Sequence, residues 1–183
     1  MTRSSAREIA VHIIFALGFD TRSAQEILDA ELTRERFQEL AEELPLYAQF
    51  PNEKQERYIR ELVQGVFAHG PELDDCIGRY SVGWAFARIP RMAAAIMRTA
   101  MYEALYMPDI PNAAAINEAV EIAKKYVDDD VVKFINGILG SFVRAQPLPR
   151  AEAGPLSDDL FDPEPAPEAE TPASEGTEPP EEA

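Results

Sequence analysis

The sequence predicts an all-α protein, and three observations support this. In successive segments of the chain, apolar residues recur at three- and four-residue steps, which places them along one face of a helix. No segment alternates apolar and polar residues for long enough to make a convincing strand. Apolar residues make up 46% of the 183 residues, enough to fill the core of one domain or of two small subdomains. We therefore expect about seven helices, or eight, packed within residues 1–146.

The first helix is expected near the start of the chain. Ser4 or Ser5 can cap a helix that begins near Ala6, and Glu8 stands three residues after Ser5, as in a capping box. The apolar face of this helix would consist of Ile9, Ala10, Ile13, Ile14 and Leu17.

Two shorter helices and a connection follow. Thr21 or Ser23 can start the second helix, and Thr33 marks the start of the third. Pro45 and Pro51 bracket a segment that we expect to be a loop.

The middle of the chain predicts three further helices with clear boundaries. Residues 53–69 carry a continuous apolar stripe that ends at a Gly-Pro pair. Residues 72–80 predict a shorter helix. Pro90 suits the first turn of the next helix, which runs to about Tyr106, because the N–H that proline lacks is not needed there.

The stretch from 112 to 140 is patterned most strongly. Apolar stripes on both sides of the aspartates at 128–130 predict two helices joined by an acidic turn. Lys124 and Lys125 fall in the last turn of the first helix, where cations suit the helix dipole. Asp129 or Asp130 is expected to cap the second helix.

The charge of the chain is unevenly distributed. The formal net charge is −16, but residues 151–183 hold eleven acidic residues and no Lys or Arg, which leaves a net of −5 for the rest. Nine of the fifteen prolines lie in 147–183. Such a segment cannot bury enough apolar surface to offset the entropy of ordering, so we predict that 147–183 is a disordered acidic tail.

Composition argues against an enzyme, a metal site and a membrane protein. The single cysteine, Cys76, excludes an internal disulfide and a cysteine-based zinc site. The two histidines, His12 and His69, fall on different predicted helices without a paired acid, and there is no Gly-rich phosphate loop. No apolar run reaches the roughly 18 residues of a membrane span, and the charged start lacks a signal peptide. We therefore expect a cytoplasmic protein with no cofactor.

Several separated motifs carry a resemblance to a known family. The run AAINEAVEIAKKY, the acidic turn and KFINGIL resemble the C-terminal signature of the NusB family of transcription antitermination factors. SAREIAV, YIRELVQGV and IPRMAAAIMRTAMYEAL agree in order and spacing, so the resemblance covers about residues 3–144. It implies two packed helical subdomains, about 1–50 and 53–146. It also implies binding of boxA-type single-stranded RNA together with ribosomal protein S10 (NusE), which helps RNA polymerase pass terminators, notably on rRNA operons.

The resemblance implies an RNA surface formed by an N-terminal arginine arm and the start of the last helix. Cations would meet phosphate there, and aromatic rings would stack unpaired bases. Phe134 can alternatively pack in the core, and the two arginines can be solvated charges. The matching residues are Arg3, Arg7, Phe15, Asp130, Lys133 and Phe134.

A second surface would bind the S10-type partner. Its candidates are Tyr80, Trp84 and Arg88, since aromatic residues and Arg are enriched at interface cores. Trp84 can alternatively be a core residue.

The arm departs from the family pattern. It reads TRSSAR, whereas family members often carry a denser arginine cluster. Fewer cations displace fewer counterions, so we expect weaker RNA binding that depends less on salt. Two functions therefore stay open: an RNA-binding antitermination factor, or a helical protein–protein scaffold or homodimer of the same fold with little RNA affinity.

Overall fold

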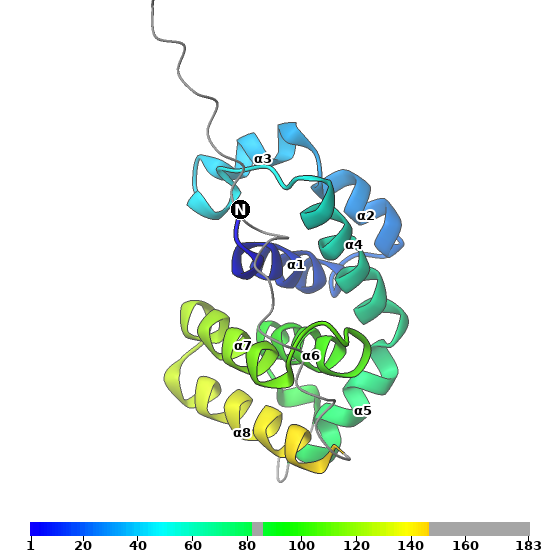
Figure 1. Ribbon diagram of the computed structural model, residues 1–183, viewed down its shortest axis with the longest axis vertical. Coiled ribbons are helices and arrows are strands. Elements are labelled where there is room, and N and C mark those ends of the chain that lie inside the picture. The colour runs from blue at the N-terminus through cyan, green and yellow to red at the C-terminus, as the bar shows by residue number, and fades with distance from the viewer. Residues whose placement is uncertain (82–85, 147–183) are drawn as a thin grey trace, which may run out of the picture.

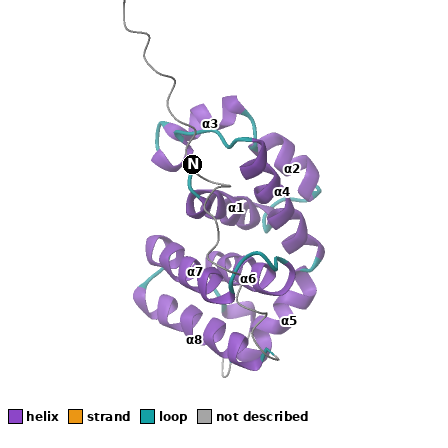
Figure 2. Ribbon diagram, in the orientation of Figure 1, coloured by secondary structure: helices purple, strands orange, loops and turns teal. Residues whose placement is uncertain are grey.

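The computed structural model describes residues 1–81 and 86–146, and in these residues the chain forms helices and loops without a strand (Figure 2). Trp84 and the predicted acidic tail lie outside the described residues. The described part contains eight α-helices, which confirms the all-α class, and two short 3₁₀ turns. Their order is α1 (Arg3–Leu17), α2 (Ala24–Glu31), α3 (Arg34–Ala41), η1 (Pro45–Tyr47), α4 (Glu53–Ala68), α5 (Gly70–Tyr80), η2 (Phe86–Arg88), α6 (Arg91–Tyr106), α7 (Asn112–Tyr126) and α8 (Asp129–Ala145).

Helix α1 lies between the two halves of the molecule (Figure 1). It packs against α2 and α4 on one side and against α6 on the other. In the lower half of the view, α6 packs against α5, α7 and α8. One core of buried apolar side chains continues through both halves, and α4 contacts elements of each. The subdomain boundary predicted near residues 50–53 stays a prediction.

Local hydrogen bonds explain where the helices of the first half begin. Ser23 and Asn52 open α2 and α4 with complete capping boxes, and Thr33 caps α3. Thr2, and not Ser4 or Ser5, caps α1: its hydroxyl accepts from the Ser5 N–H at 3.0 Å. As a result, α1 begins at Arg3, three residues earlier than the sequence predicts.

The corner between α7 and α8 is formed by the predicted acidic turn. Asp128 occupies the N-cap position of α8, and its side chain makes no capping hydrogen bond. Asp129 and Asp130 stand in the first helical turn, where their charges suit the positive end of the helix dipole. The prediction of Asp129 or Asp130 as the cap was therefore wrong by one residue or two.

Candidate nucleic-acid interface

Arg7, predicted to lie on an exposed arm, is a buried residue of α1. Its Nε atom lies 3.0 and 2.8 Å from the two carboxylate oxygens of Glu103, and Nη1 lies 3.2 Å from Glu118. The Tyr58 hydroxyl donates to the same Glu103 carboxylate at 2.5 Å. Only 2% of Arg7 is exposed, so in this structure its guanidinium cannot reach an RNA phosphate and the prediction of a contact there was wrong.

The electrostatics of this cluster keep every charge paired. Burial, the largest single effect, would lower the pKa of Arg7, but the charge and hydrogen bond of Glu103, with smaller contributions from Tyr58 and Glu118, together raise the pKa above its ordinary value. Burial, followed by the charge of Glu103, raises the pKa of Tyr58 well above its ordinary value, so the phenol stays a neutral donor. The cluster stabilises the junction of α1, α4, α6 and α7.

Arg7 is buried because of the face of α1 on which it lies. With the helix begun at Arg3, Arg7 shares a helix face with Ala10 and Ile14, both buried. Ala10 and Ile14 follow Arg7 by three and seven residues, and this helical spacing is the signal in the sequence that could have placed Arg7 on the buried face. Arg3 itself is half-buried in the first turn of α1.

The first turn of α8 keeps two predicted residues at the surface. The side chains of Lys133 and Asp130 are 76% and 94% exposed, and the Lys133 Nζ lies 3.1 Å from the Asp130 carboxylate. With Val127, Asp128 and Asp129 they line a hollow of about 620 Å³. Carboxylates accept hydrogen bonds from the amino groups of bases, and a lysine can meet phosphate, so the hollow suits polar contacts to an unpaired nucleotide.

Phe134 and Phe15 are both half-buried and pack against the core. Phe134 thus packs on the core with part of its surface in solvent, and its stacking on a base stays a prediction. Phe15 lies on the same face of α1 as Glu8 and His12, at steps of four and three residues. Its ring meets that of Phe19 edge to face, with centroids 5.2 Å apart.

Two lysines next to the acidic turn were missed as site candidates. Lys124 and Lys125, assigned only to the helix dipole, have side chains that are 54% and 55% exposed at the end of α7. Lys125 donates to the buried Glu8 carboxylate at 2.6 Å, and the Tyr126 hydroxyl donates to Glu8 at the same distance. These bonds hold the end of α7 against α1. The corner between α7 and α8 thus carries exposed lysines on both sides: Lys124 and Lys125 on α7, and Lys133 on α8.

The residues proposed for a protein partner lie at the other end of α8. Tyr80, at the end of α5, is half-buried and meets Phe142 edge to face, with centroids 6.0 Å apart. Arg88 is exposed in η2, which contacts α5. The third candidate, Trp84, lies outside the described residues.

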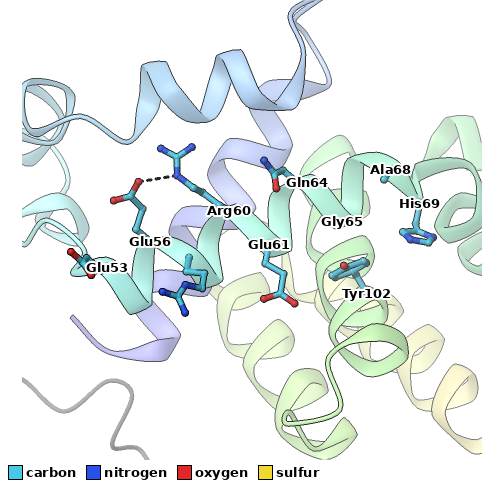
Figure 3. Close-up of a pocket in the computed structure, with 10 residues that line it drawn as sticks. Glu53, Glu56, Arg60, Glu61, Gln64, Gly65, Ala68, His69 and Tyr102 are labelled. Atoms are coloured by element: carbon cyan, nitrogen blue, oxygen red, sulfur yellow. Dashed lines mark hydrogen bonds and ion pairs between the residues drawn. The ribbon is translucent and has the colours of Figure 1, made fainter.

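A shallow groove of about 750 Å³ runs along α4 toward α6 (Figure 3). One of its charged side chains already bonds to two carboxylates: Arg60 lies 2.8 Å from both Glu56 and Asp29. Tyr102 reaches in from α6 beside Gly65 and His69. Neither this groove nor any other part of residues 1–81 and 86–146 gathers three or more His, Cys, Asp or Glu side chains that could hold a metal ion.

None of the described helices is long and apolar enough to cross a membrane. Cys76 is half-buried, and burial raises the pKa of its thiol, which disfavours the reactive thiolate.

Comparison with known proteins gives a consistent family. Residues 4–144 match the model of the NusB family. The transcription antitermination protein NusB of Acetivibrio thermocellus is 38% identical over 146 residues, which cover 80% of this chain and 91% of that protein. The protein of the same name from Bacillus subtilis is 33% identical over 141 residues, which cover 77% and 94%.

Solved structures agree with the fold. The T. maritima NusB structure superposes with a TM-score of 0.67 at 27% identity and covers 79% of this chain and 92% of that one. A structure of the antitermination factors NusB and NusE in complex with dsRNA gives a TM-score of 0.62 at 22% identity, with 79% and 97% covered, and at that identity it shows the fold alone. The chain therefore belongs to the NusB family, whose named members are transcription antitermination proteins and not enzymes.

Proposed function

We propose that this protein is a transcription antitermination factor that binds boxA-type single-stranded RNA together with ribosomal protein S10 (NusE). In this role it would modify elongation by RNA polymerase in the cytoplasm, notably on rRNA operons. Membership of the NusB family carries the proposal. The exposed lysines at the α7–α8 corner support it, since single-stranded RNA needs cations for its phosphates.

The RNA surface that we propose differs from the one predicted from the sequence. Lys133, Lys124 and Lys125 would supply the cations, Asp130 would contact a base edge, and Phe15 would supply aromatic surface. Arg3 stays a candidate at the start of α1. Arg7 is left out because its guanidinium holds two buried or half-buried carboxylates.

One observation favours the second function, a protein–protein scaffold or homodimer. With Arg7 buried, the N-terminal segment offers less cationic surface than its sequence suggests, and the turn beside Lys133 carries three aspartates. Such a surface fits a protein–protein scaffold or homodimer with little RNA affinity. The S10-type partner would bind near Tyr80 and Arg88 in either case.

Titration of labelled boxA-type RNA with the full-length protein, with and without S10, separates the two functions. An antitermination factor binds the RNA weakly alone and more tightly with S10. Absence of binding in both conditions leaves the scaffold.

The sites are tested by changing single lysines. Lys133→Ala and Lys124→Ala should each weaken RNA binding and lower its salt dependence by about one counterion. Lys54→Ala, which removes an exposed lysine of α4, is the matched control and should bind as the unchanged protein does. Equal affinities for all three variants would show that the α7–α8 corner does not contact RNA.

A further inference from the structure

Phe19 is the most exposed of the large apolar side chains in the described residues, at 64% exposure. It follows the end of α1, beyond Phe15 on the face that also carries Glu8 and His12. Its ring meets that of Phe15 edge to face, with the centroids 5.2 Å apart. A single exposed apolar side chain is common at protein surfaces, so exposure alone assigns Phe19 no role.

A cation is held against this ring. The guanidinium carbon of Arg91, at the start of α6, lies 4.2 Å from the centroid of the Phe19 ring. Arg91 Nη1 also donates to the Gly18 carbonyl at 3.3 Å, which fixes the side chain over the ring. Among residues 1–81 and 86–146, no ion pair of Arg91 with an acidic residue is found.

Asp20, the acidic residue next to Phe19, does not neutralise the charge of Arg91. Asp20 accepts from Arg22 through the side chain at 2.9 and 2.6 Å and through the backbone N–H at 2.9 Å. The hydrogen bonds from Arg22 lower the pKa of Asp20 to about 2, so the pair stays ionised and mutually neutral. The cluster of Phe15, Phe19 and Arg91 therefore presents an exposed ring with a cation held over one of its faces.

We infer that Phe19 and Arg91 form a stacking subsite for an unpaired nucleobase of single-stranded RNA, with Arg91 also meeting the adjacent phosphate. Stacking on an aromatic ring needs only the flat face of a base, and a nearby guanidinium adds both cation–π and phosphate contacts. The inference rests on the proposed function, because it extends the same surface.

The subsite is continuous with the RNA surface proposed above. Glu8, His12 and Phe15 follow one another at steps of four and three residues, so they share one face of α1, and Phe19 stands two residues beyond the end of this helix. From Glu8 to Phe15 the helix rises about 10 Å. The strand would run from the lysines at the α7–α8 corner, which Glu8 ties to α1, to the ring of Phe19 at the other end of the helix.

The experiment is a titration of full-length protein with boxA-type single-stranded RNA that carries a fluorescent label, in the presence of S10. Phe19→Ala should weaken binding about 5- to 150-fold, since one stacked base is lost, and Phe19→Trp should retain binding. Arg91→Gln should weaken binding and lower the salt dependence by about one counterion. Phe67→Ala, which removes another exposed ring from α4, is the matched control and should change nothing.

A second measurement reports stacking directly. RNA that contains 5-iodouridine should form a photo-crosslink to Phe19, located by mass spectrometry, and the crosslink should vanish in Phe19→Ala. If the unchanged protein binds RNA but Phe19→Ala binds equally well and no adduct maps to Phe19, the subsite is refuted and the proposed function stands. Loss of S10 binding in Phe19→Ala with RNA binding intact would likewise refute it and assign the ring to a protein contact. If the unchanged protein binds no RNA with or without S10, the proposed function fails and the subsite with it.

Discussion

At the scale of single residues, the buried cluster of Arg7, Glu103, Glu118 and Tyr58 shows why residue type alone misplaces a charge. The resemblance to the NusB family suggested a phosphate contact for an arginine near the N-terminus. In this structure it neutralises a fully buried carboxylate. Removal of one member of such a pair leaves the other as an uncompensated buried charge, which costs more than the net contribution of the pair.

We therefore expect Glu103→Gln to lower the free energy of unfolding by about 3–5 kcal/mol, because Arg7 would keep its charge without its closest counterion. Urea denaturation followed by circular dichroism measures this. The control is Glu121→Gln, which breaks the exposed pair with Lys124 and should cost at most about 1 kcal/mol. Similar losses for the two variants would contradict a structural role of the cluster.

His12 predicts a pH dependence of stability. Burial, helped by Lys125 and opposed by Glu8, lowers its pKa, and its Nδ1 atom lies 2.9 Å from the Tyr47 hydroxyl. The unfolded chain then binds a proton that the folded chain disfavours, so the contribution of His12 is constant above a pH of about 6.5 and lowers the stability as the pH drops below that value.

The test compares unfolding free energies at about pH 7.5 and about pH 6, on either side of the ordinary pKa of histidine. His12→Gln should show a smaller decrease between them than the unchanged protein. His69→Gln, which changes the other histidine, is the matched control. If His12→Gln and the unchanged protein lose the same free energy, His12 does not control this dependence.

At the scale of helices, the approach of α4 to α6 depends on one glycine. A Cβ atom at Gly65 would lie 1.9 Å from Cζ of Tyr102, far inside contact distance. The Tyr102 ring packs against His69 and Tyr106, with centroids 5.9 and 5.0 Å away, so it cannot move aside without loss. The close pairing of these two helices is thus a property of position 65.

Gly65→Ala should destabilise the protein by about 1–3 kcal/mol, despite the better helix propensity of alanine, because the ring must be displaced. In a Tyr102→Ala background the same change should be neutral or stabilising by up to about 1 kcal/mol. Gly137→Ala in α8, where a Cβ atom meets nothing within 4 Å, should stabilise by about 1 kcal/mol. Thermal unfolding of these variants measures the differences in stability. A Gly65→Ala protein as stable as Gly137→Ala would exclude the clash with Tyr102.

The elements that the sequence predicted well are those with local signals. Ser23 and Thr33 stand where helices begin, and the acidic turn separates α7 from α8, because capping and dipole interactions act within one turn. The predicted exposure of Arg7 was wrong because its burial depends on a long-range contact. Its partner Glu103 lies 96 positions away in the sequence, and only the packing of α1 on α6 brings the two residues together. Phe19 and Arg91, 72 positions apart, were missed on the same ground.

At the scale of the whole molecule, the charge is divided between two regions. The acidic residues of 151–183 supply eleven of the 33 in the chain, and the remaining part has a net of −5. A negative segment of this size repels polyanions at low ionic strength, and the repulsion decreases as salt screens it.

Deletion of residues 151–183 should therefore raise the affinity for nonspecific single-stranded RNA at low salt and leave the unfolding free energy unchanged. The gain should disappear near 1 M salt, where the Debye length falls to about 3 Å. Fluorescence anisotropy at both salt concentrations measures it. Equal nonspecific affinity of the two proteins at low salt would discard the idea that the acidic segment filters ligands.

The charged junction in the core also limits how the chain can be divided. A cut between α4 and α5 would leave Arg7 and Tyr58 on one fragment and Glu103 and Glu118 on the other. Each fragment would then expose ionic groups shaped for a counterpart that it lacks. We expect that neither fragment folds stably alone and that the two fragments reassociate on mixing. The two halves would then behave as complementing fragments of one domain and not as two independent modules.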